Sequence, residues 1–193
     1  GSFKGEQMTV HIDESKGCIV VNFFGVPSAG KSTGAAYVFS RLKMAGINAE
    51  LITEFAKDKV WEENAEVFKP DNQCYLFGKQ FYKMSRCRDK VEVIVTDSPL
   101  PLSILYNKSE VLGEQFNQTV MNCFNSFNNF SYLLLRDKPY NPKGRLQTEE
   151  ESDALKAPLL DLLQARNVDF TEIKGNIENY DRVADYIIEL LKK

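Results

Sequence analysis

The sequence predicts a three-layer α/β fold, in which a five-stranded, mainly parallel sheet has helices on both faces. Residues 18–24 form an apolar run without alternation, which is typical of a strand that is covered on both sides. Further strand-like runs follow at residues 49–53, 91–96, 132–135 and 168–173, with helix-like segments between them. Strands that alternate with helices indicate parallel pairing through right-handed crossovers.

The helices between these strands are predicted from apolar spacing and from end signals. Residues 32–45 have helical spacing and are followed by Gly46, which suits the end of a helix. Ser98 is expected to cap a helix with Pro99 in its first turn. Thr148 and Glu151 fit a capping box that opens a long helix. The other expected helices cover residues 72–88, 113–127 and 180–191, and the capped helix runs to about residue 166.

Composition favours one ordinary domain in a reducing setting. The chain has 193 residues, 43% of them hydrophobic, so it can bury a substantial core without disulfides. Its net charge of −3 gives no overall positive field for nucleic acid or an acidic membrane, although a local basic patch is compatible with it. The four cysteines lack paired short spacings, which argues against a structural metal site.

The expected organisation is a short extension followed by one domain. Gly1 and Ser2 are typical of an expression-tag remnant, and residues 1–16 are expected to form the remnant and an N-terminal extension. Residues 17–193 are expected to form a single domain with a lid at about residues 136–147. The apolar run at the start is too short to cross a bilayer and no signal peptide precedes it, so we expect a cytoplasmic protein without membrane contact.

Residues 25–32, GVPSAGKS, match the pattern G-x-x-x-x-G-K-[ST] between a predicted strand and a predicted helix. In such a loop the backbone N–H groups and the helix N-terminus bind phosphates. Lys31 is expected to reach the β- and γ-phosphates, and the Ser32 hydroxyl to bind Mg²⁺. The pattern therefore predicts a P-loop NTPase fold that uses ATP and Mg²⁺. The expected nucleotide-binding residues are Gly25, Ser28, Ala29, Gly30, Lys31, Ser32 and Thr33.

Two acidic residues follow predicted strands, at the sheet edge where ligands bind in open parallel sheets. Asp97 follows the third strand and is expected to bind Mg²⁺, with a possible role as base. Glu54 follows the second strand and is expected to bind the acceptor or accept its proton. The alternatives are structural: Asp97 as a helix cap and Glu54 as an acid at a helix N-terminus.

A basic loop lies between the fourth strand and the capped helix. Arg136 and Arg145 are expected to contact the transferring phosphoryl group when this lid closes over ATP, because a guanidinium matches phosphate geometry. The alternative is an ordinary solvated loop. A further hypothesis concerns four aromatic residues of the third helical segment, which are expected to pack in the core and alternatively to stack on a base: Tyr75, Phe77, Phe81 and Tyr82.

These motifs resemble the P-loop group of nucleoside and nucleotide kinases, particularly the nicotinamide riboside kinase-like ATPase domains found in phage genomes. The resemblance covers most of residues 18–192, and the phosphate loop is its specific part. The segments at 53–56 and 97–99 are similar to the acidic segments of these kinases, but the arginine that deoxynucleoside kinases carry between the acid and the serine is missing here. Residues 140–149 resemble the lid of phage-type members.

The resemblance implies a kinase, and three functions remain open at this point. The first transfers the γ-phosphoryl group of ATP to a hydroxyl of a nucleoside or nucleotide-like substrate. The second, implied by the phage-type members, phosphorylates a hydroxymethylated pyrimidine base in DNA. The third is a nucleotide-dependent regulatory ATPase without an acceptor. The absence of an N-K-x-D segment argues against a guanine-specific switch.

Overall fold

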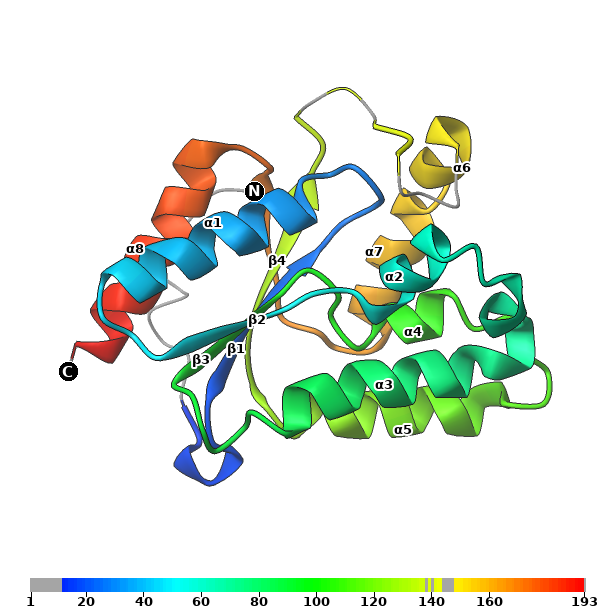
Figure 1. Ribbon diagram of the computed structural model, residues 1–193, viewed down its shortest axis with the longest axis horizontal. Coiled ribbons are helices and arrows are strands. Elements are labelled where there is room, and N and C mark those ends of the chain that lie inside the picture. Colours follow the sequence, from blue (N-terminus) through cyan, green and yellow to red (C-terminus); the bar gives the residue numbers. More distant parts are fainter. Residues whose placement is uncertain (1–11, 138, 140, 144–147, 193) are drawn as a thin grey trace.

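Five strands form one sheet that is parallel throughout, with the order β2-β3-β1-β4-β5 (Figure 1). The structure is a computed structural model and describes residues 12–137, 139, 141–143 and 148–192. The strands are β1 Ile19–Phe24, β2 Ala49–Ile52, β3 Val93–Thr96, β4 Asn128–Leu135 and β5 Thr171–Lys174. The predicted fold class is therefore confirmed. The N-terminal extension was expected at residues 1–16, and its first 11 residues lie outside the part of the chain that the structure describes.

Helices cover both faces of this sheet (Figure 1). One face carries α1 Lys31–Met44 and α8 Ile177–Leu191. The other carries α3 Gln73–Ser85, α4 Leu102–Leu105, α5 Gly113–Asn125 and α7 Lys156–Ala165. The shorter elements are α2 Phe55–Trp61, α6 Glu149–Asp153, and the 3-10 turns η2 Glu14–Lys16, η3 Ala65–Phe68 and η4 Pro70–Asn72.

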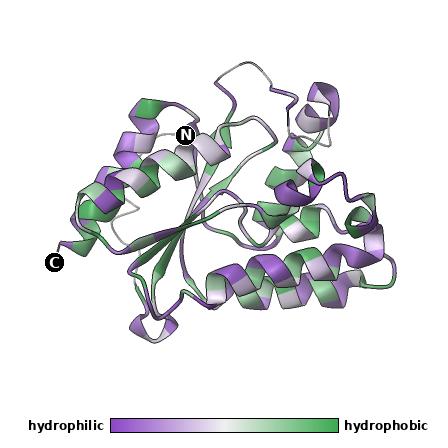
Figure 2. Ribbon diagram, in the orientation of Figure 1, coloured by the Kyte–Doolittle hydropathy of each residue, from purple (hydrophilic) through white to green (hydrophobic). Residues whose placement is uncertain are grey.

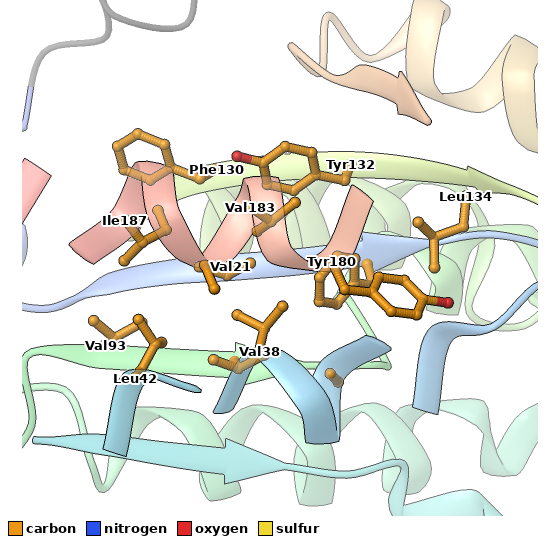
Figure 3. Close-up of a cluster of buried hydrophobic side chains, with 14 of the residues drawn as sticks. Val21, Val38, Leu42, Val93, Phe130, Tyr132, Leu134, Tyr180, Val183 and Ile187 are labelled. Carbon is orange, nitrogen blue, oxygen red and sulfur yellow. The ribbon is translucent and has the colours of Figure 1, made fainter. Parts of the chain in front are cut away.

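The central strand β1 supplies side chains to both cores, as its unbroken apolar sequence predicts. Val21 and Phe23 point into the core under α1 and α8, whereas Val20 and Phe24 point into the core on the opposite face. Figure 3 shows the first of these cores, where Val38 of α1 and Val183 of α8 meet the sheet. Along the strands hydrophobic residues dominate, while the helices alternate hydrophobic and hydrophilic positions (Figure 2). The burial of β1 on both faces makes its carboxyl end a rigid mount for the following loop.

Two helix predictions are wrong in detail. The helix after Asp97 begins at Leu102, and its first turn is closed by the Leu102 N–H donating to the Pro99 carbonyl. Ser98 is consequently not its cap, and the Ser98 N–H donates instead to Thr96 Oγ1 at 3.0 Å. The residues between strand and helix form turns that stay at the sheet edge.

The helix predicted for residues 148–166 is two helices, α6 and α7. Its capping box is present: the Glu151 N–H donates to Thr148 Oγ1, and the Thr148 N–H donates to the Glu151 carboxylate. The helix is interrupted at Ala154. In a continuous helix the Ala154 carbonyl would accept from the N–H of residue 158, which is a proline and has none. Proline is tolerated in the first turn of the new helix, α7.

Among the described helices, none is long and apolar enough to cross a lipid bilayer.

Two helical glycines provide a matched test of this packing. A Cβ on Gly34 of α1 would lie 2.5 Å from Cε1 of Tyr180, whereas a Cβ on Gly78 of α3 would meet nothing within 4 Å. We expect Gly78→Ala to raise the free energy of unfolding by about 0.5–1 kcal/mol, since alanine is the better helix former. Gly34→Ala should lower it despite the same gain in propensity.

Urea unfolding of both variants measures the difference. Equal stabilisation by the two substitutions would show that α8 does not pack closely against α1.

Candidate active site

The phosphate loop connects β1 to α1, and its last glycine starts the helix. Gly30 occupies the helix-cap position with φ of 104°, a conformation that favours glycine, and Lys31 is the first residue of α1. Ser32 follows on the first turn, where its side chain is exposed. The N-terminus of a 14-residue helix therefore opens at the edge of the sheet, and the first N–H groups of a helix are a binding site for phosphate.

Side chains from three elements hold the carbonyl groups on the outer side of this loop. Tyr180 of α8 donates its hydroxyl to the Gly30 carbonyl at 2.9 Å, and burial raises the pKa of Tyr180 to about 12. The phenol therefore stays protonated and remains a donor at neutral pH. The Pro27 carbonyl accepts from Ser152 Oγ at 2.9 Å and from Arg136 Nη2 at 3.2 Å.

Arg136 lies behind the loop in this conformation, joined to α6. Its guanidinium donates to Ser152 Oγ and is 2.7 Å from the Asp153 carboxylate. These contacts hold the loop, and the predicted phosphoryl contact, for which these bonds would have to rearrange, stays a prediction. Arg145, the other predicted arginine, lies outside the described residues.

Ser28 joins the loop to the described part of the predicted lid. It is one of the non-glycine residues with positive φ, at 67°. Its hydroxyl donates to the Asn141 carbonyl and accepts from the Asn141 N–H, both at 3.1 Å. The lid segment at residues 141–143 is thus attached directly to the phosphate loop.

A cavity of about 280 Å³ opens beside Lys31 and Ser32, and both predicted carboxylates line it. Asp97 enters from the end of β3, and Glu54 from the junction of β2 and α2. The structure therefore brings together four predicted residues from three separate segments of the sequence. The walls combine apolar side chains from α2, η3, α3 and α4 with polar side chains; they include Val60, Phe68, Leu76, Leu102, Tyr106, Lys57, Gln73 and Ser103.

Asp97 is held in an environment that opposes its charge. It is 8% exposed, and burial raises the pKa of its carboxyl group above the ordinary value of 3.8. The neighbouring Glu54 charge raises the pKa further, while Lys31 and Lys57 lower it. Within the described part of the chain, Asp97 Oδ1 is buried without a hydrogen-bond partner. A buried, unpartnered carboxylate oxygen needs a cation or a hydroxyl donor.

Mg²⁺ fits this donor set. The Ser32 hydroxyl and the Asp97 carboxylate, which line the same cavity, offer the hard oxygen atoms that Mg²⁺ prefers. The described residues contain no group of three or more His, Cys, Asp or Glu side chains suited to a metal ion. Mg²⁺ bound with nucleotide needs only one or two protein ligands, because phosphates and waters supply the others. The helix-cap alternative for Asp97 is wrong, because α4 begins five residues later, at Leu102.

Glu54 stands at the N-cap position of α2, but its side chain makes no capping hydrogen bond. Gln80 of α3 fixes the backbone on both sides of it. The Gln80 amide donates to the Thr53 carbonyl at 3.2 Å, and its oxygen accepts from the Phe55 N–H at 2.9 Å. Gln80 is 6% exposed and lines the cavity, so its polar ends are used to hold the turn that presents Glu54.

The cavity is not lined by the other predicted nucleotide-binding residues, Gly25, Ala29, Gly30 and Thr33. Ala29 is buried, while Thr33 is exposed on α1. A small hollow of about 20 Å³ lies here between the loop and the β5–α8 connection, lined by Ser28, Ala29, Gly30, Thr33, Gly175 and Tyr180. The loop therefore borders both the large cavity and the small hollow, and Ser28 lines the two of them.

The sequence interpretation missed Gln80 and Lys57, because single polar residues on amphipathic helices carry no motif. The expectation for the aromatic residues was partly wrong. Phe77 is buried, but Tyr75 and Tyr82 are 43% and 62% exposed. Both tyrosines lie on the exposed side of α3. Residues 75, 79, 82 and 86 share this side, because they are spaced by three or four positions along the helix.

A protein-family model described as an AAA domain matches residues 20–179, which include the loop, both carboxylates and most of the sheet. The chain belongs to this family. The expected resemblance to P-loop kinases is thereby confirmed at the level of the P-loop domain. No curated protein matches the sequence of this AAA domain. A solved structure, the APS kinase CysC Cys556Ala mutant of Mycobacterium tuberculosis, aligns with a TM-score of 0.49 and 17% identity, over 91% of this chain and 98% of that one.

The burial of Asp97 predicts a cost in stability. Its folded-state pKa is raised, so the folded AAA domain favours the protonated acid, and this contribution to stability is lost as the pH rises through that pKa. Without nucleotide or Mg²⁺, Asp97→Asn should have a higher Tm than the wild type at pH 7. The gain should shrink as the pH falls from 7 towards 4, because a carboxyl with a raised pKa becomes increasingly protonated on the way.

Differential scanning calorimetry at both pH values checks the sign. A variant that is less stable than the wild type at pH 7 and equally so at pH 4 would contradict it.

Gln80 is expected to affect catalysis indirectly, because both ends of its amide bind the backbone on either side of Glu54. Gln80→Leu keeps the side chain buried but removes the acceptor of the Phe55 N–H and leaves the Thr53 carbonyl with Lys83 Nζ, at 3.0 Å, as its side-chain donor. Because Glu54 is predicted to bind the acceptor or accept its proton, and a small displacement of such a group lowers the rate strongly, we expect kcat to fall on the order of tenfold. KM for ATP should stay unchanged.

Steady-state kinetics and thermal unfolding of Gln80→Leu separate the two roles. A lower Tm with wild-type kcat would make Gln80 purely structural.

Proposed function

We propose that this AAA domain is an ATP-dependent kinase that transfers the γ-phosphoryl group to a hydroxyl of a nucleoside-like or nucleotide-like acceptor. The observation that carries the proposal is the cavity in which Lys31 and Ser32 face Asp97 and Glu54. A site that only hydrolysed ATP needs room for water beside the γ-phosphate. Here a volume of about 280 Å³, with an apolar wall, adjoins that position.

ATP would bind with its phosphates in the loop and its nucleoside towards the small hollow by Thr33 and Gly175. Gly30 and the first N–H groups of α1 would contact phosphate oxygens, and Lys31 would neutralise charge on the β- and γ-phosphates. Ser32 and Asp97 would hold Mg²⁺, which supplies charge neutralisation at the phosphates. This arrangement leaves the larger cavity for the acceptor.

In the proposed reaction the acceptor hydroxyl lies between the γ-phosphorus and the carboxylates. Glu54, or Asp97 if it is not committed to the metal, accepts the hydroxyl proton as the acceptor oxygen forms its bond to phosphorus. The bond from the γ-phosphorus to the β,γ-bridging oxygen breaks, and ADP leaves with that electron pair. Arg145 is proposed to contact the transferring group from the lid.

The shape and chemistry of the cavity support an acceptor with a flat ring and several hydroxyls. Phe68, Tyr106 and Leu102 offer apolar surface to a base, and Gln73 and Ser103 offer polar groups. Lys57 on α2 adds a positive charge that an acceptor phosphate could use. A free nucleoside, a nucleotide and a nucleotide within DNA all share this chemistry.

The proposal predicts that Lys31→Ala abolishes transfer. The substitution removes the charge that meets the phosphates and leaves the core of the fold unchanged. We expect the rate of transfer of labelled γ-phosphate to a panel of nucleosides, nucleotides and oligonucleotides to fall by about 10²-fold or more.

Lys43→Ala is the matched control, since Lys43 is an exposed lysine near the other end of α1. It should transfer phosphate at the wild-type rate. Wild-type transfer by Lys31→Ala would refute the kinase proposal, and ATP hydrolysis without transfer to any acceptor would favour the regulatory ATPase.

A further inference from the structure

The outer face of α3 carries aromatic and basic side chains in alternation. Tyr75, Lys79, Tyr82 and Arg86 follow one another at i, i+4, i+7 and i+11, which places them on one side of the helix. We name these four residues the α3 face. All are exposed, and the two tyrosines are exposed by 43% and 62%.

Each cation of the α3 face lies by a ring. Lys79 Nζ is 5.8 Å from the centroid of the Tyr75 ring, and Arg86 Cζ is 5.9 Å from that of Tyr82. These contacts are within the range of cation–π attraction. They place two exposed rings and two positive charges along a line of about 16 Å, the length of eleven residues of helix.

The charge around this face departs from that of the whole chain. Residues 73–88 contain Lys79, Lys83, Arg86 and Arg88 and no Asp or Glu, whereas the full sequence has a net charge of −3. Asp89 follows directly, and the neighbouring α2 region carries Asp58, Glu62 and Glu63. Of these acids, Glu62 is paired with Lys59 at 2.8 Å. Lys83 and Arg88 are directed elsewhere, because Lys83 Nζ donates to the Thr53 carbonyl and the Arg88 guanidinium donates to Ser126. The positive charge of the α3 face is therefore that of Lys79 and Arg86.

A merely solvated helix face would carry charges of both signs and few large rings. Here three of the seven exposed large hydrophobic side chains of the described residues belong to α2 and α3: Trp61, Tyr75 and Tyr82. Exposed rings that alternate with cations match the surface on which single-stranded nucleic acid binds. Bases stack on the rings, and phosphates pair with the cations.

We propose that the α3 face binds single-stranded nucleic acid. An acidic peptide would use the cations but not the rings, and a duplex would keep its bases stacked on one another, away from the tyrosines. The occupant that uses both halves of the pattern is a strand with unstacked bases.

The α3 face also leads to the cavity. The Tyr75 ring packs edge-on against Phe55, with centroids 5.8 Å apart, and Phe55 directly follows Glu54. On its inner side, α3 lines the cavity with Gln73, Leu76 and Gln80. A strand on the α3 face could therefore place one nucleotide in the acceptor cavity. This step, unlike the binding itself, rests on the proposed kinase function.

The test is the fluorescence anisotropy of labelled twelve-residue oligo(dT) with the full chain. Lys79→Glu/Arg86→Glu should weaken binding tenfold or more and reduce the slope of log Kd against log salt by about 1.4, or about 0.7 for each lost contact with a single-stranded phosphate. Tyr82→Ala should weaken binding about fivefold or more, through the loss of one stacked base.

The control is Lys43→Glu/Arg182→Glu, which makes the same charge change with exposed residues of α1 and α8, across the sheet. It should bind oligo(dT) within about twofold of the wild type. A (dT)·(dA) duplex and poly-glutamate should bind the wild type more weakly than oligo(dT).

Equal losses in the α3 and control variants, unchanged binding by Tyr82→Ala, or poly-glutamate binding as tight as oligo(dT) would overturn the proposal. Phosphoryl transfer to small acceptors by the α3 variants, measured in parallel, keeps the two proposals apart. If the wild type binds oligo(dT) through α3 but transfers phosphate to nothing, the kinase proposal fails and the binding surface stands.

Discussion

The phosphate loop can bind phosphate only if its backbone is held open, and this constraint organises the surrounding structure. A loop that turns its N–H groups inward turns carbonyl groups outward, and these need donors when they are buried. Tyr180 supplies a donor to Gly30, while Arg136 and Ser152 supply donors to Pro27. The last helix, the end of β4 and the helix after the lid thus meet at one loop. Glycine is required where α8 comes close, because a Cβ on Gly30 or Gly34 would collide with Tyr180.

In the cavity beside the loop, a buried carboxylate lacks part of its hydrogen bonding. Asp97 has one oxygen without a partner among the described residues, and burial and Glu54 both oppose its ionisation. Such a group is costly in a fold that binds nothing, and it is useful where a cation and a hydroxyl arrive with the substrates. Gln80 holds the second carboxylate by its backbone on both sides, so that Glu54 keeps its place without a capping bond.

Most of the fold could be predicted from the sequence because its signals are local. The buried run of β1, the loop motif and the capping box at Thr148 each depend on a few adjacent residues, and all are found in the structure. Errors occurred where local signals compete. The apolar pattern of residues 148–166 predicts one helix, but Pro158 interrupts it. Ser98 resembles a helix cap, but its N–H donates to Thr96 Oγ1.

The site was only partly predictable. Asp97 and Glu54 could be placed at one sheet edge because parallel strands all end there. Gln80, Lys57 and Tyr106 reach the same cavity from three different helical regions, and only the packing of those elements brings them together. The exposed rings of Tyr75 and Tyr82 were expected in the core, because an aromatic residue at helical spacing does not by itself show which side of the helix is buried.

The kinase proposal requires the cavity beside the phosphate loop to receive the phosphoryl acceptor. The most direct measurement is a crystal structure with Mg²⁺, a non-hydrolysable ATP analogue and the best acceptor from the transfer assays. We expect the γ-phosphate to contact Lys31 and the acceptor hydroxyl to lie about 2.6–3.2 Å from a carboxylate oxygen of Glu54 or Asp97. An acceptor bound elsewhere, or a cavity that closes completely around ATP and water, would contradict it.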